Sequence, residues 1–401
     1  MKIIIGSRII VITTLFLLFF SGMGGYNNVY GYGIVIFYSL CFSFCIYFLK
    51  ELFVSRMPSK IIYLCPFFVW FIFILFSGSF APDFKVHLVD FILTLTIWIG
   101  IAFFTLKLRC YDYKGILKKT IVIWCAINFL LYLLYIGGVF SINPGLSFSG
   151  LYENRNTLAV TGAFLLAVFI NYSDTSFRSL VVGLVILFLI MSTASSKGVI
   201  SGVIVYCIWI YSQIKSKRGI AFTVLCTFSI VILFYHGYFD EALARLLGRF
   251  NMFDSFVTSL GVDSIVSIHA QSSQNHRIEL SKQALELFYH QPVWGYGLRG
   301  SEAFLRLGGG PTYTHNNYME MLVSGGMVGF IFYYVPIFFL ALILFLSKGK
   351  NIKYCSETRI AVSFMLLLIF NQSAQVSYKS FIILFAIFYV VFIVINFGRE
   401  K

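Results

Sequence analysis

A histidine and two asparagines stand directly before a long apolar run, in the segment "HNNYMEMLVSGGMVGF" that begins at His315. An imidazole has an unperturbed pKa near neutrality, so His315 can take a proton from a hydroxyl group. Asn316 and Tyr318 add hydrogen-bonding groups at the boundary between the polar and the apolar segment. His276, next to Arg277, is a second candidate for the same role. The segment predicts proton-transfer chemistry at the mouth of a membrane-spanning helix.

Three cations share a setting that suits an anion. Arg155 lies in "LYENRNTLAV" between Asn154 and Asn156, Lys197 in "STASSKGVIS", and Arg277 in "QNHRIEL". Arg and Lys are the usual partners of phosphate oxygens, and helix N-termini favour anions. Contact with lipid headgroups is the alternative for any one of them. The three together predict a diphosphate-binding site.

The composition indicates the elements that must position these residues. Of 401 residues, 59% are hydrophobic and only 11% are charged, against roughly 25% charged in a soluble domain. The apolar runs are continuous and about 20 residues long, which favours helices over barrel strands. The sequence predicts an all-α polytopic membrane protein with about twelve spans, at 5–25, 29–49, 61–80, 88–106, 120–140, 157–171, 179–193, 198–212, 219–238, 319–347, 360–376 and 380–397.

The distribution of positive charge predicts the orientation. With both termini in the cytoplasm, the inner loops carry most Lys and Arg, whereas the outer loops carry few. The net charge of +14 therefore reflects membrane topology rather than nucleic-acid binding. We expect a membrane bundle over 1–238, one large outer loop over 239–317, and a second part of the bundle over 318–401.

Two helices are predicted in the large outer loop. One starts at Asp240 and has an amphipathic pattern suited to the membrane surface. The other covers 272–291, with Ile278, Leu285 and Phe288 on one face, and Pro292 follows its end.

Several kinds of site are disfavoured. The eight cysteines have no CxxC spacing, and the outer carboxylates are dispersed, so the sequence predicts no metal site and no cofactor. Few carboxylates lie within spans, and no internal repeat is evident, which disfavours a proton-coupled transporter.

Five segments, in order, resemble the family of O-antigen polymerases and O-antigen ligases. His315 and Asn316 with Gly326 and Gly329 match its H-N, nine residues, G-x-x-G pattern. The other similar segments are "FYHQPVWGYGLRG", which has the P-x-x-G-x-G pattern of Pro292, Gly295 and Gly297, and "NHRIELSKQALELF", "LYENRNTLAV" and "SSKGVISGV".

The resemblance implies a C-type glycosyltransferase fold and metal-independent transfer from an undecaprenyl-diphosphate-linked glycan. Arg277 would hold the diphosphate with help from Arg155 and Lys197, and His315 would be the general base. Lys197 stands where the family often has Arg, so a bidentate contact is lost there. The implied location is the bacterial inner membrane, with the active site on its outer face.

Three functions remain open. A polymerase of O-antigen or other polysaccharide repeat units is favoured, with lipid-linked glycans as donor and acceptor, and with a chain-length regulator and a flippase as further partners. A ligase that transfers finished glycan to lipid A core would use the same chemistry. A flippase without chemistry is the third, although it would be expected to show internal twofold similarity.

Overall fold

The computed structural model describes most helices of the chain. The described residues are 11–15, 17, 35–46, 65–108, 112–139, 148–150, 152, 154–172, 177–193, 195–213, 264–307, 310–311, 314, 316–346, 356–372 and 378–397. His315, the predicted span 219–238 and the helix predicted from Asp240 lie outside them.

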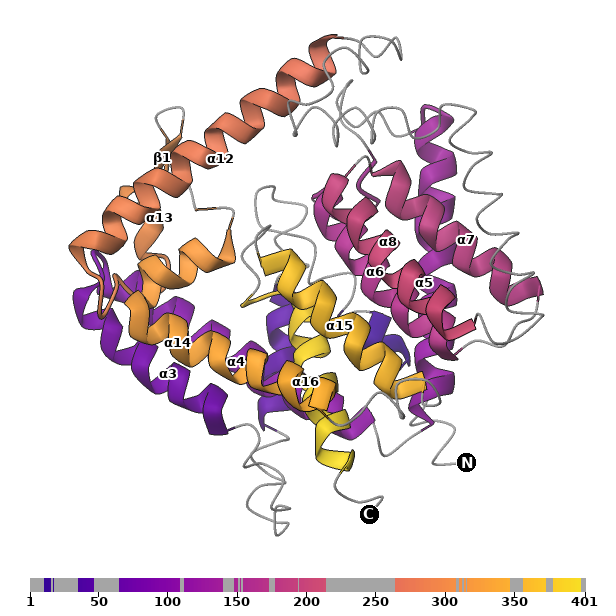
Figure 1. Cartoon of the computed structure of the whole chain (residues 1–401), viewed down its shortest axis with the longest axis horizontal. Coiled ribbons are helices and arrows are strands. Elements are labelled where there is room, and N and C mark those ends of the chain that lie inside the picture. The colour runs from indigo at the N-terminus through magenta and orange to yellow at the C-terminus, as the bar shows by residue number, and fades with distance from the viewer. Residues whose placement is uncertain are drawn as a thin grey trace. The chain divides into compact units, whose positions relative to one another are not determined.

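Helices account for nearly all the described structure (Figure 1). In chain order they are α3 (Cys65–Ser77), the short 3-10 helix η2 (Gly78–Phe80), α4 (Phe84–Leu108), α5 (Tyr113–Ile136), α6 (Arg155–Tyr172), α7 (Phe177–Ser192), α8 (Ser196–Gln213), α12 (Ser264–His290), α13 (Gly300–Phe304), α14 (Asn317–Leu346), α15 (Ser356–Gln372) and α16 (Phe381–Phe397). Two-residue strands β1 (Arg306–Leu307) and β2 (Gly310–Pro311) form an antiparallel pair.

These helices support the predicted class of protein. Within the described residues, α5, α14 and residues Phe84–Thr105 of α4 are long and apolar enough to cross a membrane, and five shorter apolar helices accompany them. Apart from α12 and α13, the described helices overlap predicted spans. The chain is therefore a helical membrane protein, whereas the count of twelve spans, the orientation and the three predicted domains stay predictions.

Packing divides the chain into two compact units. The first unit comprises Met1–Ile34, Leu108–Ser272 and Ile352–Leu367, and the second comprises Val35–Lys107, Ser273–Asn351 and Leu368–Lys401.

The first unit is organised around α6. This helix packs against α5, α7 and α8, and it is buried almost continuously from Leu158 to Phe169. Its small residues allow close approach of its neighbours, since a Cβ atom added at Gly162 would lie 2.8 Å from Ile190 of α7. A helix buried all round is expected to be apolar on every side, which explains its lack of a polar face.

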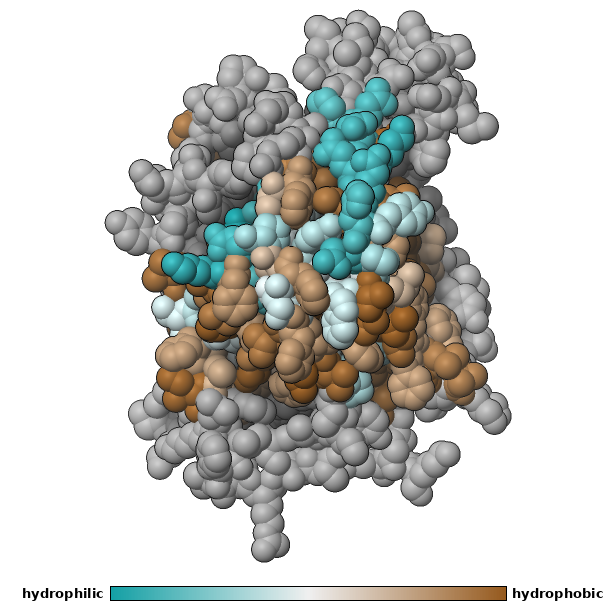
Figure 2. All heavy atoms as spheres, turned by 90° about the vertical axis from the view of Figure 1, so that its left-hand side faces the viewer, coloured by the Kyte–Doolittle hydropathy of each residue, from teal (hydrophilic) through white to brown (hydrophobic). Residues whose placement is uncertain are grey.

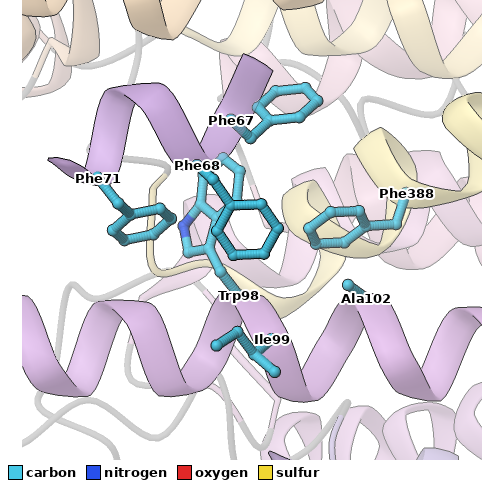
Figure 3. Close-up of a pocket in the computed structure, with 7 residues that line it drawn as sticks. All are labelled: Phe67, Phe68, Phe71, Trp98, Ile99, Ala102 and Phe388. Atoms are coloured by element: carbon cyan, nitrogen blue, oxygen red, sulfur yellow. The ribbon is translucent and has the colours of Figure 1, made fainter. Parts of the chain in front are cut away.

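The second unit has an aromatic core between α3, α4, α14 and α16. Trp70, Trp98 and Tyr333 are buried, with ring centroids 5.1–6.2 Å apart in tilted and edge-to-face pairs. Figure 3 shows a small hollow beside this core, lined only by apolar side chains: Phe67, Phe68, Phe71, Trp98, Ile99, Ala102 and Phe388. No charged group lines the hollow, so it is not a site for a charged substrate.

Helix α14 is interrupted at Gly326, which has φ 60° and ψ −164°. In a regular helix the amide of Met327 would donate to the carbonyl of Val323. Here Met327 donates instead to the carbonyl of Pro292 at 2.7 Å, and the carbonyl of Val323 accepts from the amide of Tyr296 at 2.8 Å. The predicted span at 319–347 agrees with the apolar helix α14, but the sequence did not reveal the break inside it, because the break depends on a distant segment of backbone.

We name this arrangement the glycine clasp: the backbone of Pro292–Gly297 hydrogen-bonded to the interrupted turn Val323–Met327. Gly297 donates to the carbonyl of Ser324 at 2.9 Å, and Ser77 of α3 donates its hydroxyl to the same carbonyl. Backbone groups freed by a helix break must find partners within a membrane protein. The clasp supplies these partners. The P-x-x-G-x-G and G-x-x-G patterns are therefore explained by the hydrogen bonds between the two segments that carry them.

Replacing Gly295 with alanine is expected to open the clasp. Gly295 has φ +67°, and a Cβ atom there would lie 2.5 Å from the amide nitrogen of Gly326. The left-handed conformation alone costs a residue with a side chain about 1–2 kcal/mol, and the contact adds to that. We expect a lower midpoint of thermal unfolding in detergent and less monodisperse protein on size-exclusion chromatography.

The matched control is Gly183→Ala in α7, where an added Cβ would contact nothing within 4 Å. Alanine is favoured over glycine inside a helix, so this variant should equal the wild type or exceed its stability. A Gly295→Ala protein as stable as the wild type would contradict the clasp.

Candidate functional site

In the first unit, two predicted cations stand at the starts of adjacent helices. Arg155 is the first residue of α6, and Lys197 is the second residue of α8. The side chain of Asn154 accepts from the amide of Asn156 at 2.8 Å, and the hydroxyl of Ser195 accepts from the amide of Gly198 at 3.3 Å. Both helix starts are thus capped by side chains that precede the cations.

Direct contacts join these two helix starts. The hydroxyl of Ser195 donates to the side-chain oxygen of Asn156 at 2.7 Å. One turn further along, a Cβ atom at Gly198 would lie 2.3 Å from the Cβ of Ala159, so the helices touch where both residues are small. Figure 1 shows α6 and α8 side by side, in agreement with their packing. Two positive helix ends and two half-buried cations gather here, which suits an anion.

In the second unit, Arg277 lies on the packed side of α12. Leu280 and Ala284 are buried in a cluster with Leu305 and Val323, and Leu287 packs against it. Arg277 is half-buried, three residues before Leu280, and so shares this face of the helix. The side chain of Arg277 therefore extends from the face of α12 that packs on α14.

The apolar face predicted for this helix is not the face that is buried. Ile278 and Leu285 are exposed, at 47% and 37% of their surface. The buried face carries Leu280 and Ala284 instead. Polar residues surround these two positions in the sequence, so the apolar pattern did not reveal this face. His276, predicted as a second candidate base, is exposed and lies one position off the packed stripe. Helix α12 ends at His290, two residues before Pro292, which was predicted to follow its end.

Polar and apolar surfaces separate on this unit. Figure 2 shows a hydrophilic surface along α12 and a hydrophobic surface over the membrane helices beneath it. Exposed apolar side chains of α3 and α14, such as Phe76 at 62% and Phe339 at 58%, belong to helices that the lipid would surround. Arg277 thus belongs to a helix of polar surface beside the apolar part of the unit.

The residues on both sides of position 315 are held by hydrogen bonds. The hydroxyl of Thr314 donates to the carbonyl of Asn316 at 2.8 Å, and the side chain of Asn316 accepts from the amide of Tyr318 at 2.9 Å. Asn316 therefore caps α14. The hydroxyl of Tyr318 donates to the carbonyl of Ile369 at 3.0 Å, which ties the first turn of α14 to the end of α15.

Asn317 extends this anchoring into the apolar part of the unit. Its side-chain amide donates to the hydroxyl of Tyr334 at 2.9 Å and to the side-chain oxygen of Gln372 at 2.6 Å. All three side chains are buried. Hydrogen bonds are strong in a low-dielectric interior, so these bonds anchor the start of α14.

A buried acid close to this start was not singled out from the sequence. Glu320 is 2% exposed, and its carboxyl contacts the hydroxyls of Ser301, Thr314 and Ser324 at 2.9–3.2 Å. Its position in the sequence, near a helix end, gave no sign of this burial. A signal was present in its spacing, since it falls on the same face of α14 as Asn317 and Ser324.

A second unpredicted polar stripe lies on α4. His87 and Asp90 are both buried although most of the helix is apolar. The Nδ1 atom of His87 accepts from the amide of Leu298 at 2.8 Å, and Asp90 forms an ion pair with Lys379. A Cβ atom at Gly297 would lie 2.6 Å from the same His87 nitrogen. Gly297 therefore acts through packing of the clasp on α4.

The turn after the clasp carries one further cation. Arg299 has φ 59°, and its guanidinium donates to Glu302 through two nitrogens. This hydrogen bonding to Glu302 raises the pKa of Arg299 above its ordinary value, so the side chain stays charged. Because its charge is matched by Glu302, the pair stabilises the turn and is not assigned to substrate.

The predicted site residues thus fall into two sets. Asn154, Arg155, Asn156 and Lys197 are brought together within the first unit, whereas His276, Arg277, Gly297, Asn316 and Tyr318 belong to the second. Among the described residues, no three His, Cys, Asp or Glu side chains gather in a way that could hold a metal ion. The absence of a metal requirement stays a prediction.

Comparison with known sequence families gives one match, over the middle of the chain. Residues 158–334 match the family described as O-antigen ligase. This match confirms, for these residues, the similarity to the O-antigen polymerase and ligase family that the sequence motifs indicated. No curated protein matches it.

The family match covers most of the candidate site. Lys197, Arg277 and position 315 lie inside 158–334, and Arg155 lies three residues before it. Members of this family are O-antigen ligases and polymerases, which are glycosyltransferase-like enzymes with lipid-linked glycan substrates. The match does not distinguish a ligase from a polymerase.

Proposed function

We propose that the protein polymerises undecaprenyl-diphosphate-linked oligosaccharide repeat units at the outer face of the bacterial inner membrane. It would transfer the growing glycan onto a new lipid-linked repeat unit. The observation that carries this proposal is the O-antigen ligase family match, because it includes Lys197, Arg277 and His315 in the order of the family's motifs. The product would serve lipopolysaccharide or another surface polysaccharide.

The chemistry assigned to these residues is a single displacement. The acceptor hydroxyl oxygen attacks the anomeric carbon of the donor, and the bond between that carbon and the diphosphate oxygen breaks. The lipid diphosphate leaves with the electron pair of that bond. The hydroxyl proton passes to His315, whose ordinary pKa suits a general base near neutral pH.

Neutralising the leaving diphosphate lowers the barrier further. Negative charge grows on the diphosphate as the bond breaks, so cations placed in advance stabilise the transition state more than the ground state. Arg277 on the packed face of α12, and Arg155 and Lys197 at two adjacent helix starts, are the groups assigned to this task. With the charge neutralised by side chains, neither a metal ion nor a cofactor is needed.

A ligase is the second candidate, favoured by the description of the matching family. It would move finished glycan from the same carrier lipid to lipid A core. Donor, base and diphosphate site would be shared, so the two enzymes differ only in the acceptor. A flippase is the weaker alternative, because it needs neither a general base nor a leaving group. A chain-length regulator and a flippase are proposed as partners of the polymerase.

Deletion of the gene separates these functions on a glycan gel. A polymerase deletion is expected to leave one repeat unit on the acceptor, because ligation of single units continues. A ligase deletion would leave no glycan on the acceptor while polymer remains on the carrier lipid. Loss of all polymer together with repeat units trapped on the inner face would indicate a flippase and contradict the proposal.

A further inference from the structure

The strongest unexplained feature is the buried carboxyl of Glu320 in the first turn of α14, five residues after His315. Its oxygens contact the hydroxyl of Ser301 at 2.9 and 3.0 Å, that of Ser324 at 3.2 Å and that of Thr314 at 3.2 Å. These three donors come from α13, from the next turn of α14 and from the residue directly before His315.

Stability alone does not account for this acid. Within the described part of the chain, Glu320 forms no salt bridge, and its contacts are all to neutral hydroxyls. A buried carboxylate without a cation is costly, and an apolar side chain of similar volume would pack there at lower cost. The carboxyl group is therefore better explained by the residues that its hydrogen bonds keep in place.

The number of protons available to these hydrogen bonds indicates whether the carboxyl group of Glu320 is neutral or ionised. The hydroxyl of Thr314 has one proton, and it lies nearer to the carbonyl of Asn316, at 2.8 Å, than to Glu320, at 3.2 Å. With that proton on the shorter contact, the oxygens of Thr314 and Glu320 face each other and need a second proton between them. A neutral carboxyl group supplies it, donating to Thr314 while accepting from Ser301 and Ser324.

The resulting chain of hydrogen bonds spans position 315. It runs from the carboxyl of Glu320 to the hydroxyl of Thr314 and on to the carbonyl of Asn316. The same hydroxyl of Thr314 accepts from the amide of Asn316 at 3.3 Å. The backbone on both sides of His315 is therefore fixed from the interior of the second unit.

From this geometry we infer that Glu320, as a neutral acid, is a positioning residue for His315. This inference rests on the proposed role of His315 as the general base. Glu320 does not touch the reacting atoms; its hydrogen bonds hold Thr314 and Asn316, the two neighbours of His315 in the chain. We expect loss of these hydrogen bonds to misplace the base, and a displacement of about 1 Å can lower a rate roughly a hundredfold.

Two substitutions separate positioning from packing. In Glu320→Gln the amide nitrogen can donate to Thr314 and the amide oxygen can accept from Ser301 and Ser324, which imitates the neutral acid. In Glu320→Leu the volume is kept and all hydrogen bonds are lost. With purified protein in liposomes and lipid-linked repeat units extracted from a deletion strain, Gln should retain kcat within about threefold, and Leu should lower kcat roughly ten- to a hundredfold with little change in KM.

Controls make each outcome decisive. Glu302→Gln, at the acid of the neighbouring α13 that pairs with Arg299, should keep wild-type kcat. The double variant Glu320→Leu with His315→Ala should be no slower than His315→Ala alone, because a misplaced base and a missing base are equivalent. Where Glu320→Leu does not reach the membrane, Thr314→Val breaks the same chain of hydrogen bonds and should give the same loss of kcat.

Wild-type kcat in Glu320→Leu or Thr314→Val would overturn the inference. A Glu320→Gln variant as slow as the leucine variant would also overturn it, because the ionised carboxylate would then be required. An active His315→Ala protein would instead overturn the proposed function. An inactive His315→Ala beside a fully active Glu320→Leu would leave the base in place and remove only the positioning role.

Discussion

Replacing His315 with alanine is expected to abolish chain extension while the protein remains in the membrane. General base catalysis contributes about 10²- to 10⁴-fold, so a glycan gel from cells carrying this variant should show no long-chain polymer. Asn316, Asn317 and Tyr318 hold the start of α14 through hydrogen bonds that this substitution leaves in place, so folding should be preserved. Protein level is checked by immunoblotting of membranes.

His290→Ala is the matched control for this experiment. His290 is an exposed histidine at the end of α12 and has no assigned role. Its loss should leave the glycan pattern unchanged. Normal long-chain glycan from His315→Ala would remove the catalytic assignment, whatever the control shows.

Arg277→Lys is expected to lose most activity, by about tenfold or more. The substitution keeps the positive charge but replaces a planar fork with a single ammonium, and only the fork can bind two phosphate oxygens in parallel. Arg277 is half-buried one helical turn before the buried Leu280, so a lysine at this position would extend from the same face of α12. The measurement is the rate of polymer formation per molecule of membrane-inserted protein.

Lys282→Arg controls for changes of cation type on the same helix. Lys282 is exposed on α12 and should tolerate the exchange without loss of rate. Activity near that of the wild type in Arg277→Lys would mean that the diphosphate binds elsewhere, with Arg155 and Lys197 as the remaining candidates.

The helical membrane class could be predicted because it depends on local properties. Runs of about 20 apolar residues must form helices in lipid, where every backbone group needs a partner. The described helices accordingly fall at predicted spans, for example α5 at Tyr113–Ile136 and α16 at Phe381–Phe397. The boundaries differ by several residues, since polar residues at helix ends such as Arg155 also join the helix.

The interruption of α14 could not be predicted in this way. Gly326 lies in an apolar run that is compatible with an unbroken helix, and its break exists only because Pro292–Gly297 supply partners for the freed backbone groups. The glycine patterns were visible in the sequence, but their pairing depends on contacts about 30 residues apart. The same holds for His87, whose role is set by the distant amide of Leu298.

The sequence predicted candidate site residues from their types. It did not reveal the residues that support them in the fold. Arg155 and Lys197 were expected to act together, and the hydrogen bond between Asn156 and Ser195 joins their segments. Glu320 was missed because burial of a single carboxyl is a tertiary property. Its neighbours Ser301 and Thr314 are ordinary polar residues until the fold brings them to one point.

The most direct test of the account uses purified protein in liposomes with lipid-linked repeat units as both donor and acceptor. In buffer containing EDTA, we expect the wild-type protein to produce a ladder of polymer on the carrier lipid and release of undecaprenyl diphosphate, and we expect His315→Ala to produce neither. No ladder from wild-type protein under these conditions, or an equal ladder from the variant, would contradict the account.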